Sequence, residues 1–398
     1  MRITTVTPLA VRIPRDLIKA IGTAGSPAAF GNVGGSSRYR WAETYRTVYA
    51  TAIETTVVRV DTDAGLIGWG EAQSPVAPEV TCAIIESLLG PLVTGDDPLA
   101  PEPLWDRLYG AMRVRGQTGG FFLDAIAAID TAVWDICGKA LGQPVSRLLG
   151  GPETADLPCY ISGLAGTTLD EQVEDAGAHI QRGARAFKVF LGGTTRECLT
   201  LVDRLREAFG ERVEIFVDAL WRLTTKSAIR FAGDLQARGV GWLEAPLMPE
   251  DVQGHRRVTA SVEIPIAIGE SYRSRFELLP FFEARALDVL QPDLGRTGLT
   301  EGRRIAALAG AFHVPLAPHI SIGLGPQIAA ALHFSAATSN LQVVECNPQV
   351  YEVANQFLRR PIPFSADRLT LPAGAGLGIE LDEVALQRFV VRGGGRSQ

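Results

Sequence analysis

Three short apolar runs decide the fold of this chain, and each ends in a carboxylate: Glu214-Ile-Phe-Val-Asp218, Val240-Gly-Trp-Leu-Glu244 and Ile264-Pro-Ile-Ala-Ile-Gly-Glu270. The acids follow one another at an even stride of 26 residues (244 − 218 and 270 − 244). Strand–helix units of constant length would deliver all three to the same end of one parallel sheet. Converging carboxylates without adjacent cysteines or paired histidines favour Mg²⁺ over Zn²⁺. The alternative is three solvated acids with no metal.

The same rhythm extends over the second half of the chain. From Leu157 onward, eight strand-like runs end near Ser162, Leu191, Asp218, Glu244, Glu270, Asp293, His319 and Glu345. Helical patterns separate most of them, and this alternation predicts a parallel sheet. Eight such units over this length predict a closed (β/α)8 barrel of the TIM type, which we place at residues 126–355.

The first part, residues 1–125, is predicted to be an α+β capping domain. Strand-like runs at 3–13, 54–61 and 66–72 are followed by helical patterns, one of which is expected to stop at Gly90-Pro91. A loop rich in glycine and serine is expected at about 21–40, and a long loop without regular structure often serves as a lid. A surface insertion without function is the alternative. Residues 356–398 leave the barrel rhythm, and we expect them to return to the cap.

Composition and charge narrow the class of protein. The chain has 398 residues, of which 46% are hydrophobic and 21% charged, so a large core is available without disulfides. Five scattered cysteines indicate reduced thiols in the cytoplasm. A net charge of −6 without a Lys/Arg-rich run argues against nucleic acid, and no stretch reaches membrane-span length. We expect a cytoplasmic enzyme with neither a nucleic-acid nor a membrane partner.

The residues that close the predicted strands are the catalytic candidates, because barrel active sites lie at the C-terminal ends of the strands. His319 is the best general acid/base, since histidine titrates near neutral pH, and Asp293 could accept a hydrogen bond from its imidazole. Any one ionisable residue there could be a bystander, so the joint pattern makes the prediction. The full set is Lys188, Asp218, Glu244, Glu270, Asp293, His319 and Glu345.

Lys188 lies in the apolar run Ala186-Phe-Lys-Val-Phe190 of a chain in which lysine is rare. A lysine where arginine is the usual cation suggests a need for a tunable amine. Burial beside a metal site is expected to lower its pKa. The alternative is a strand lysine whose ammonium group reaches water.

Several stretches are typical of one enzyme family: Ala125-Ile-Ala-Ala-Ile-Asp-Thr-Ala-Val-Trp-Asp-Ile-Cys-Gly-Lys139, Leu148-Leu-Gly-Gly151, Trp242-Leu-Glu-Ala-Pro246, Ile268-Gly-Glu270 and Leu290-Gln-Pro-Asp293. Over nearly its whole length the chain resembles the enolase superfamily, within the mandelate racemase/muconate lactonizing enzyme family and its mandelate racemase subgroup.

The resemblance implies a role for each strand-end residue. Asp218, Glu244 and Glu270 would bind Mg²⁺. Asp293 and His319 would form a dyad with His319 as base or acid. Glu345 would hydrogen-bond the carboxylate of the substrate, and Lys188 would occupy the position that modulates the pKa of a second base. Enzymes of this kind abstract a proton α to a carboxylate, and the metal stabilises the resulting enediolate.

Two positions depart from the family pattern. The usual Lys-x-Lys pair reads Lys188-Val189-Phe190, and the usual Asn of Asp-x-Asn is Leu220. Because Phe190 cannot move a proton, we expect a one-base reaction on His319, namely β-elimination of water from a hydroxy acid or sugar acid. An epimerase or racemase, or a lactone cycloisomerase, is the runner-up, and a non-catalytic homologue is a third hypothesis.

The substrate is expected to be a small-molecule carboxylate, and the assembly a homo-oligomer, either a dimer or an octamer. Arginines in the cap could meet a distal carboxylate or hydroxyls of the substrate, although solvated surface arginines explain them equally well. The candidate substrate-binding residues are Arg115, Gln117, Tyr160, Ser162, Phe190 and Trp221.

Overall fold

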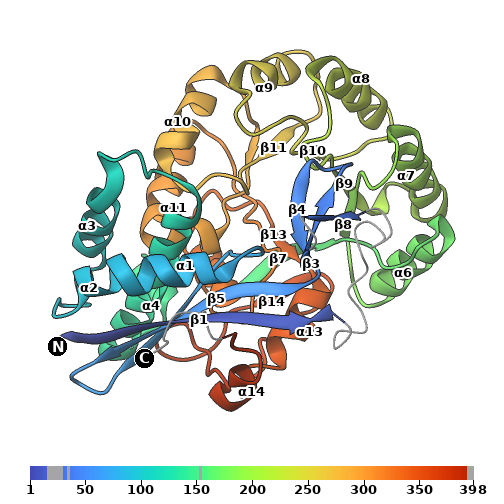
Figure 1. Cartoon of the computed structure of the whole chain (residues 1–398). Coiled ribbons are helices and arrows are strands. Elements are labelled where there is room, and N and C mark those ends of the chain that lie inside the picture. Colours follow the sequence, from blue (N-terminus) through green and yellow to red (C-terminus); the bar gives the residue numbers. More distant parts are fainter. Residues whose placement is uncertain (16–29, 34–35, 152–154, 392–398) are drawn as a thin grey trace.

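A computed structural model describes residues 1–15, 30–33, 36–151 and 155–391 of the chain. It consists of a barrel with its helices on the outside and a cap that packs against one side of it (Figure 1).

The barrel sheet contains β7 (Asp156–Ser162), β8 (Ala186–Phe190), β9 (Glu214–Asp218), β10 (Trp242–Glu244), β11 (Ile266–Ile268), β12 (Val289–Leu290) and β13 (Val344–Cys346). They are ordered β12-β11-β10-β9-β8-β7-β13, and each pair of neighbours is parallel. The seventh expected run forms isolated bridges, in which Leu316 pairs with both Leu290 and Leu341. Pro315 and Pro318 lack the N–H groups that a longer ladder needs. The ring therefore closes through this segment, and the predicted fold class is confirmed.

Helices return the chain between the strands: α6 (Leu169–Gln181), α7 (Thr195–Phe209), α8 (Thr225–Gln236), α9 (Val252–Thr259), α10 (Arg275–Ala284), α11 (Leu294–Ala311) and α12 (Pro326–Ala336). Capping boxes begin α6, α7, α8 and α10, so a side chain at each start satisfies otherwise unpaired N–H groups. Inside the barrel, the rings of Phe216 and Trp242 stack 3.4 Å apart, with Tyr160 edge-on to both. These buried rings form an apolar floor beneath the strand ends.

The cap is built on an antiparallel sheet of β1 (Ile3–Pro14), β5 (Ala52–Thr62) and β6 (Ile67–Ala72). The long helix α4 (Gly120–Leu141) packs on it because β6 has two glycines at the contact. A Cβ at Gly70 would lie 1.9 Å from the carbonyl oxygen of Ala128. The helix runs unbroken through 125/126, where the sequence analysis placed a domain boundary.

Two expectations about the cap are wrong. The helix α1 (Pro78–Ile84) does not stop at Gly90-Pro91, because a π turn (Ile85–Leu89) leads into α2 (Gly90–Val93). Pro91 falls in the first turn of α2, where a missing N–H costs nothing. The expected loop at 21–40 contains β2 (Phe30–Val33) and most of β3 (Ser36–Ala42), which pairs with β4 (Thr47–Ala50). Residues 21–29 and 34–35 of that loop lie outside the described residues.

The tail contacts the first strand of the cap. Val390 bridges to Val11, and the Arg12 N–H donates to the carbonyl of Phe389. Before this, β14 (Arg368–Thr370) pairs antiparallel with β7, so the tail also holds the barrel. The remaining helices are α3 (Pro101–Arg113), α5 (Val145–Leu148), α13 (Pro348–Asn355) and α14 (Glu383–Gln387). Among the helices of the described ranges, none is long and apolar enough to cross a membrane.

Candidate active site

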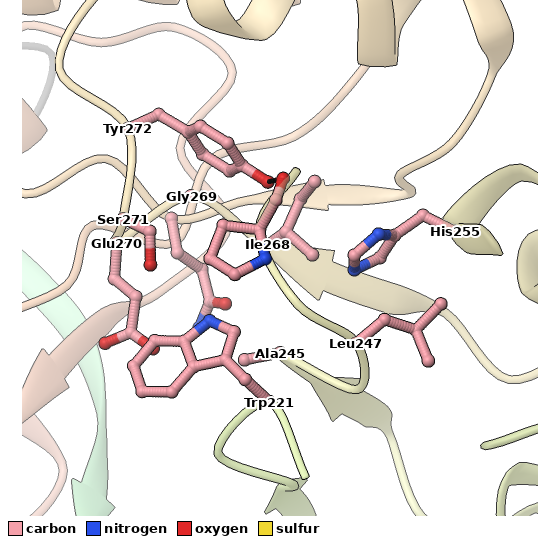
Figure 2. Close-up of a pocket in the computed structure, with 11 residues that line it drawn as sticks. Trp221, Ala245, Leu247, His255, Ile268, Gly269, Glu270, Ser271 and Tyr272 are labelled. Atoms are coloured by element: carbon pink, nitrogen blue, oxygen red, sulfur yellow. Dashed lines mark hydrogen bonds between the residues drawn. The ribbon is translucent and has the colours of Figure 1, made fainter. Parts of the chain in front are cut away.

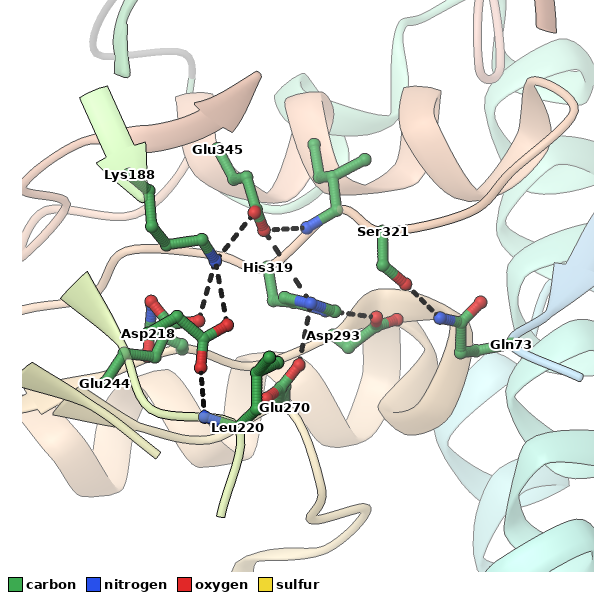
Figure 3. A network of polar contacts seen from close by, with 12 residues as sticks. Gln73, Lys188, Asp218, Leu220, Glu244, Glu270, Asp293, His319, Ser321 and Glu345 are labelled. Atoms are coloured by element: carbon green, nitrogen blue, oxygen red, sulfur yellow. Dashed lines mark hydrogen bonds and ion pairs between the residues drawn. The ribbon is translucent and has the colours of Figure 1, made fainter. Parts of the chain in front are cut away.

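Seven ionisable side chains meet at the carboxyl end of the barrel strands (Figure 3). Three come from the last residues of β9 and β10 and from the turn after β11, and the others follow or lie on β8, β12, the bridging segment and β13. All are buried except Glu270, which is partly exposed. The structure thus brings together every residue that was predicted to close a strand: Lys188, Asp218, Glu244, Glu270, Asp293, His319 and Glu345.

Asp218, Glu244 and Glu270 offer oxygens that all lie within 4.8 Å of one another. Burial, together with the negative charge of Glu244, raises the pKa of Asp218 well above its ordinary value. Within the described residues, Oε1 of Glu270 is buried without a hydrogen-bond partner. A set of hard carboxylate oxygens that repel one another, one of them unpaired, fits a divalent cation such as Mg²⁺.

Neighbouring groups hold this triad in place. The Leu220 N–H donates to Oδ1 of Asp218 at 2.8 Å, and Nε2 of Gln291 donates to Oε2 of Glu244 at 2.6 Å. Leu220 and Trp221 both have positive φ values of 53° and 57°, which costs about 1–3 kcal/mol for each non-glycine residue. Such strain persists only where the surrounding structure enforces it. Here the strained turn of Leu220 and Trp221 comes directly after Asp218 and Ala219, next to a candidate metal ligand.

His319 contacts a carboxylate through each ring nitrogen. Nδ1 lies 2.7 Å from Oδ2 of Asp293, and Nε2 lies 2.8 Å from Oε2 of Glu270. Burial alone would lower the pKa of His319, but the charges of Glu270 and Glu345 and the hydrogen bond with Asp293 raise it well above its ordinary value. Because Asp293 takes Nδ1, the nitrogen that faces the triad is Nε2, which is the atom that can exchange a proton with a bound substrate.

Lys188 is the cation at the centre of the acids. Its Nζ lies 2.7 Å from Oε1 of Glu244, 2.8 Å from Oε1 of Glu345 and 3.9 Å from Oδ2 of Asp218. The expectation of a lowered pKa is wrong for this arrangement. Burial does favour the neutral amine, but the surrounding carboxylates outweigh it and raise the pKa of Lys188 well above its ordinary value. Lys188 therefore acts as a fixed positive charge.

Four of the six substrate-binding candidates lie at or beside the cluster. The Ser162 hydroxyl hydrogen-bonds Glu345, and the Phe190 ring lies 5.6 Å from Nζ of Lys188. Tyr160 belongs to the apolar floor. Figure 2 shows the Trp221 indole beside Glu270, at a small pocket whose lining also includes Ala245, Tyr272 and His255.

The other two candidates lie elsewhere. Arg115 and Gln117 are exposed on the segment between α3 and α4, where the N–H of each donates to the carbonyl of Met112. These hydrogen bonds are local, and the structure does not bring the two residues to the acids.

Sequence reasoning missed three residues on the side of the site that faces the cap, namely Arg222 of the barrel and Tyr45 and Tyr49 of the cap. The guanidinium of Arg222 lies 5.5 Å from the ring centre of Tyr45, which is 5.9 Å from that of Tyr49. Burial, the Tyr45 hydroxyl and the charges of Asp218 and Glu270 raise the pKa of Tyr49 to about 12. The small sheet of β3 and β4 thus faces the triad, close to β8 and β9 (Figure 1). Nothing in the sequence distinguishes these tyrosines from ordinary strand residues.

A (β/α)8 barrel with an α+β cap, three clustered carboxylates and a His–Asp dyad at its mouth defines an enzyme of the enolase superfamily. Two family models match the chain: the enolase C-terminal domain-like family over residues 170–385, and the N-terminal domain of mandelate racemase / muconate lactonizing enzyme over residues 42–150. The chain belongs to the mandelate racemase/muconate lactonizing enzyme family.

Relatives of this family align along most of the chain. A D-galactarolactone cycloisomerase of Agrobacterium fabrum is 35% identical over 84% of this chain and 90% of its own length. A D-galactonate dehydratase of Verminephrobacter eiseniae is 32% identical over 85% of this chain and 92% of its own. The crystal structure of an enolase superfamily member from Agrobacterium tumefaciens superimposes with a TM-score of 0.91 at 34% identity, covering 97% of this chain and 98% of that one.

Proposed function

We propose that the protein is a Mg²⁺-dependent acid sugar dehydratase, which removes the proton α to a carboxylate and then eliminates water from the β-carbon. The observation that carries this proposal is the placement of His319, whose Nε2 faces the carboxylate triad while Asp293 holds Nδ1. The dehydratases among its relatives support the reaction class.

Asp218, Glu244 and Glu270 would hold the cation, which supplies charge stabilisation for the carboxylate of the substrate as it becomes an enediolate. His319 accepts the α-proton at Nε2, and Asp293 stabilises the imidazolium through the Nδ1–H. Lys188 holds Glu345 by an ion pair of 2.8 Å, which keeps this carboxylate in place beside the substrate carboxylate.

A single histidine can complete the elimination. The α-carbon–hydrogen bond breaks and its electrons form the carbon–carbon double bond, while the bond between the β-carbon and its hydroxyl breaks. His319 returns its Nε2 proton to the departing hydroxide, which leaves as water. The enol product then tautomerises to a 2-keto-3-deoxy acid. Phe190 provides no second acid or base, so this route needs fewer proton-transfer groups than epimerisation does.

A lactone cycloisomerase is the second candidate, because a cycloisomerase is among the most similar relatives. The same α-proton transfer to His319 would then expel a ring oxygen of the substrate instead of hydroxide.

A product screen tests the proposal. The purified protein, with Mg²⁺, is incubated with a panel of mono- and diacid sugars and their lactones, including D-galactonate and D-galactarolactone. We expect a 2-keto-3-deoxy product that reacts with semicarbazide. This product should not form when EDTA removes the Mg²⁺. Mass spectrometry separates the two candidates, because dehydration removes 18 mass units and isomerisation of a lactone removes none. Epimer formation without a keto product would contradict both.

A further inference from the structure

A buried acid of the cap lies close to the dyad without belonging to the cluster. Glu71, near the end of β6, is completely buried. Within the described residues it forms no ion pair, which is unusual for a buried carboxylate. The hydrogen-bond donors that surround Glu71 explain how its carboxylate is held in a buried position.

The hydrogen-bond partners of the Glu71 carboxylate all donate to it, and two of the three, Leu324 and Gln327, lie just before or in the first turn of α12. Oε1 accepts from the Thr55 hydroxyl at 2.9 Å and from the Leu324 N–H at 2.8 Å. Oε2 accepts from the Gln327 N–H at 3.2 Å. Gly325 is the N-cap residue of α12 and has no side chain that could accept a hydrogen bond from the first N–H groups of the helix. Glu71 of the N-terminal domain supplies the carboxylate that this helix end lacks.

The helix that Glu71 caps reaches the dyad at its second residue. Nε2 of Gln327 donates to Oδ1 of Asp293 at 3.0 Å, beside the Gly295 N–H at 2.8 Å. The other carboxylate oxygen of Asp293 holds Nδ1 of His319 at 2.7 Å. A Cβ at Gly295 would lie 2.5 Å from the Gln327 side chain, so the amide has little room to move.

A second contact from the same strand end strengthens this connection. The Gln73 side chain donates to the Ser321 hydroxyl on the segment that follows His319 (Figure 3). The Gln73 N–H also donates to the carbonyl of Gly295 at 2.8 Å. The cap thus holds both the segment after the histidine and the turn after its aspartate.

We propose that Glu71, a residue of the cap, positions the catalytic histidine of the barrel by way of Gln327. The proposal rests on the proposed role of His319 as the base. Glu71 does not touch the substrate. It fixes the end of α12, this fixes the Gln327 amide, and the amide together with Gly295 sets the direction of the Asp293 carboxylate. Partners of this kind orient catalytic side chains, and removing one costs roughly 10- to 100-fold in activity.

Two variants break the connection at different points. Glu71→Gln keeps the shape but replaces one acceptor oxygen with an NH₂ group and removes the carboxylate from the N-terminus of α12, which weakens the contact with the Leu324 and Gln327 N–H groups. Gln327→Met keeps the length of the side chain but removes the donor to Asp293. Because the two act at separate contacts, the second keeps the test decisive where the first lowers the yield of folded protein.

Asp130→Asn is the matched control. Asp130 lies on α4, is also buried, and also accepts two hydrogen bonds from a barrel helix, from the Thr300 N–H at 2.8 Å and its hydroxyl at 2.5 Å. Among the described residues, no hydrogen bond joins Thr300 to the side chain of Asp293. This variant should change the melting temperature without changing the dyad.

The first readout needs only the protein and Mg²⁺. In ¹⁵N-histidine-labelled protein, which contains five histidines, the Nδ1 proton of His319 is identified by its loss in His319→Asn. We expect Glu71→Gln and Gln327→Met to shift this resonance and Asp130→Asn to leave it unchanged. An unshifted resonance in both cap-to-dyad variants would overturn the proposal, as would an equal shift in the control.

The second readout is kinetic and uses the acid that the product screen identifies. We expect kcat to fall by roughly 10- to 100-fold in the two variants, with KM changed by less than about twofold. Equal losses of kcat in Asp130→Asn would mean general loosening and overturn the proposal. If the wild-type protein turns over no acid while the resonance still shifts as expected, the proposed function fails and the positioning role stands.

Discussion

Lys188→Met tests the electrostatic balance of the acid cluster. The substitution keeps most of the apolar stem and removes the ammonium that pairs with Glu244 at 2.7 Å and Glu345 at 2.8 Å. Without it the buried carboxylates repel one another, and no described cation takes its place at these distances. We expect the metal-free protein to lose stability and to regain part of it when Mg²⁺ binds.

The size of the loss follows from Glu345. Burial alone would raise its pKa, but Lys188 and His319 lower it from 4.5 to about 2. The difference corresponds to about 3 kcal/mol of stability, present in full above pH 4.5 and lost as the pH falls through about 2. Breaking a buried ion pair by removing one partner costs about 3–5 kcal/mol, which agrees. Lys188 is the largest contributor to this lowering of the pKa, so a loss of up to about 3 kcal/mol at pH 7 is expected in Lys188→Met.

Urea unfolding in EDTA and in saturating Mg²⁺ measures both effects. Lys139→Met is the control, since Lys139 also pairs with a buried carboxylate, Asp135 at 2.6 Å, but away from the triad. A Mg²⁺ concentration of about 100 times Kd increases the unfolding free energy of the wild-type protein by about 2.7 kcal/mol. The increment should be larger in Lys188→Met and unchanged in Lys139→Met. A loss below about 1 kcal/mol in EDTA, or equal Mg²⁺ increments in the three proteins, would refute the reasoning.

Three further predictions concern other parts of the molecule. Phe190→Lys restores the second lysine of the Lys-x-Lys pair and should add a proton donor beside Lys188, so that chiral chromatography detects an epimer of the substrate. Unchanged products would show that Phe190 does not limit the reaction. Arg222→Ala should raise KM by roughly tenfold with little change in kcat, because it removes a cation of the cap-side wall, and steady-state kinetics would contradict this by showing an unchanged KM. Burial raises the pKa of Asp130 from 3.8 to about 7, so its contribution to stability is complete below pH 3.8 and lost as the pH rises through about 7. The difference in unfolding free energy between wild type and Asp130→Asn should fall by up to about 4 kcal/mol from pH 4 to pH 8, and a pH-independent difference would contradict this.

The residues at the strand ends were predictable because strand–helix units of equal length place their last strand residues next to one another at one end of a parallel barrel. The stride through Asp218, Glu244 and Glu270 therefore predicted both the fold and the place where the acids meet. The same logic located His319, although two prolines leave its segment without a continuous ladder.

Other features depend on long-range packing that periodicity does not encode. Tyr45 and Tyr49 reach the site because the small sheet of the cap lies over the barrel mouth, and Arg115 does not because its loop lies at the far end of α3. The raised pKa of Lys188 results from carboxylates on three other strands, whereas the sequence alone suggested only burial. Glu71 is an ordinary strand acid in the sequence and acquires its partners only when the cap docks.

The central claim is that His319 is the acid and base of an α-proton transfer at the triad. Its most direct test is exchange of the substrate α-proton in D₂O with Mg²⁺, followed by ¹H NMR and mass spectrometry, in the wild type and in His319→Asn that still folds and binds Mg²⁺. We expect deuterium to enter the substrate or product with the wild type and not with the variant. Exchange that persists in His319→Asn would contradict the account.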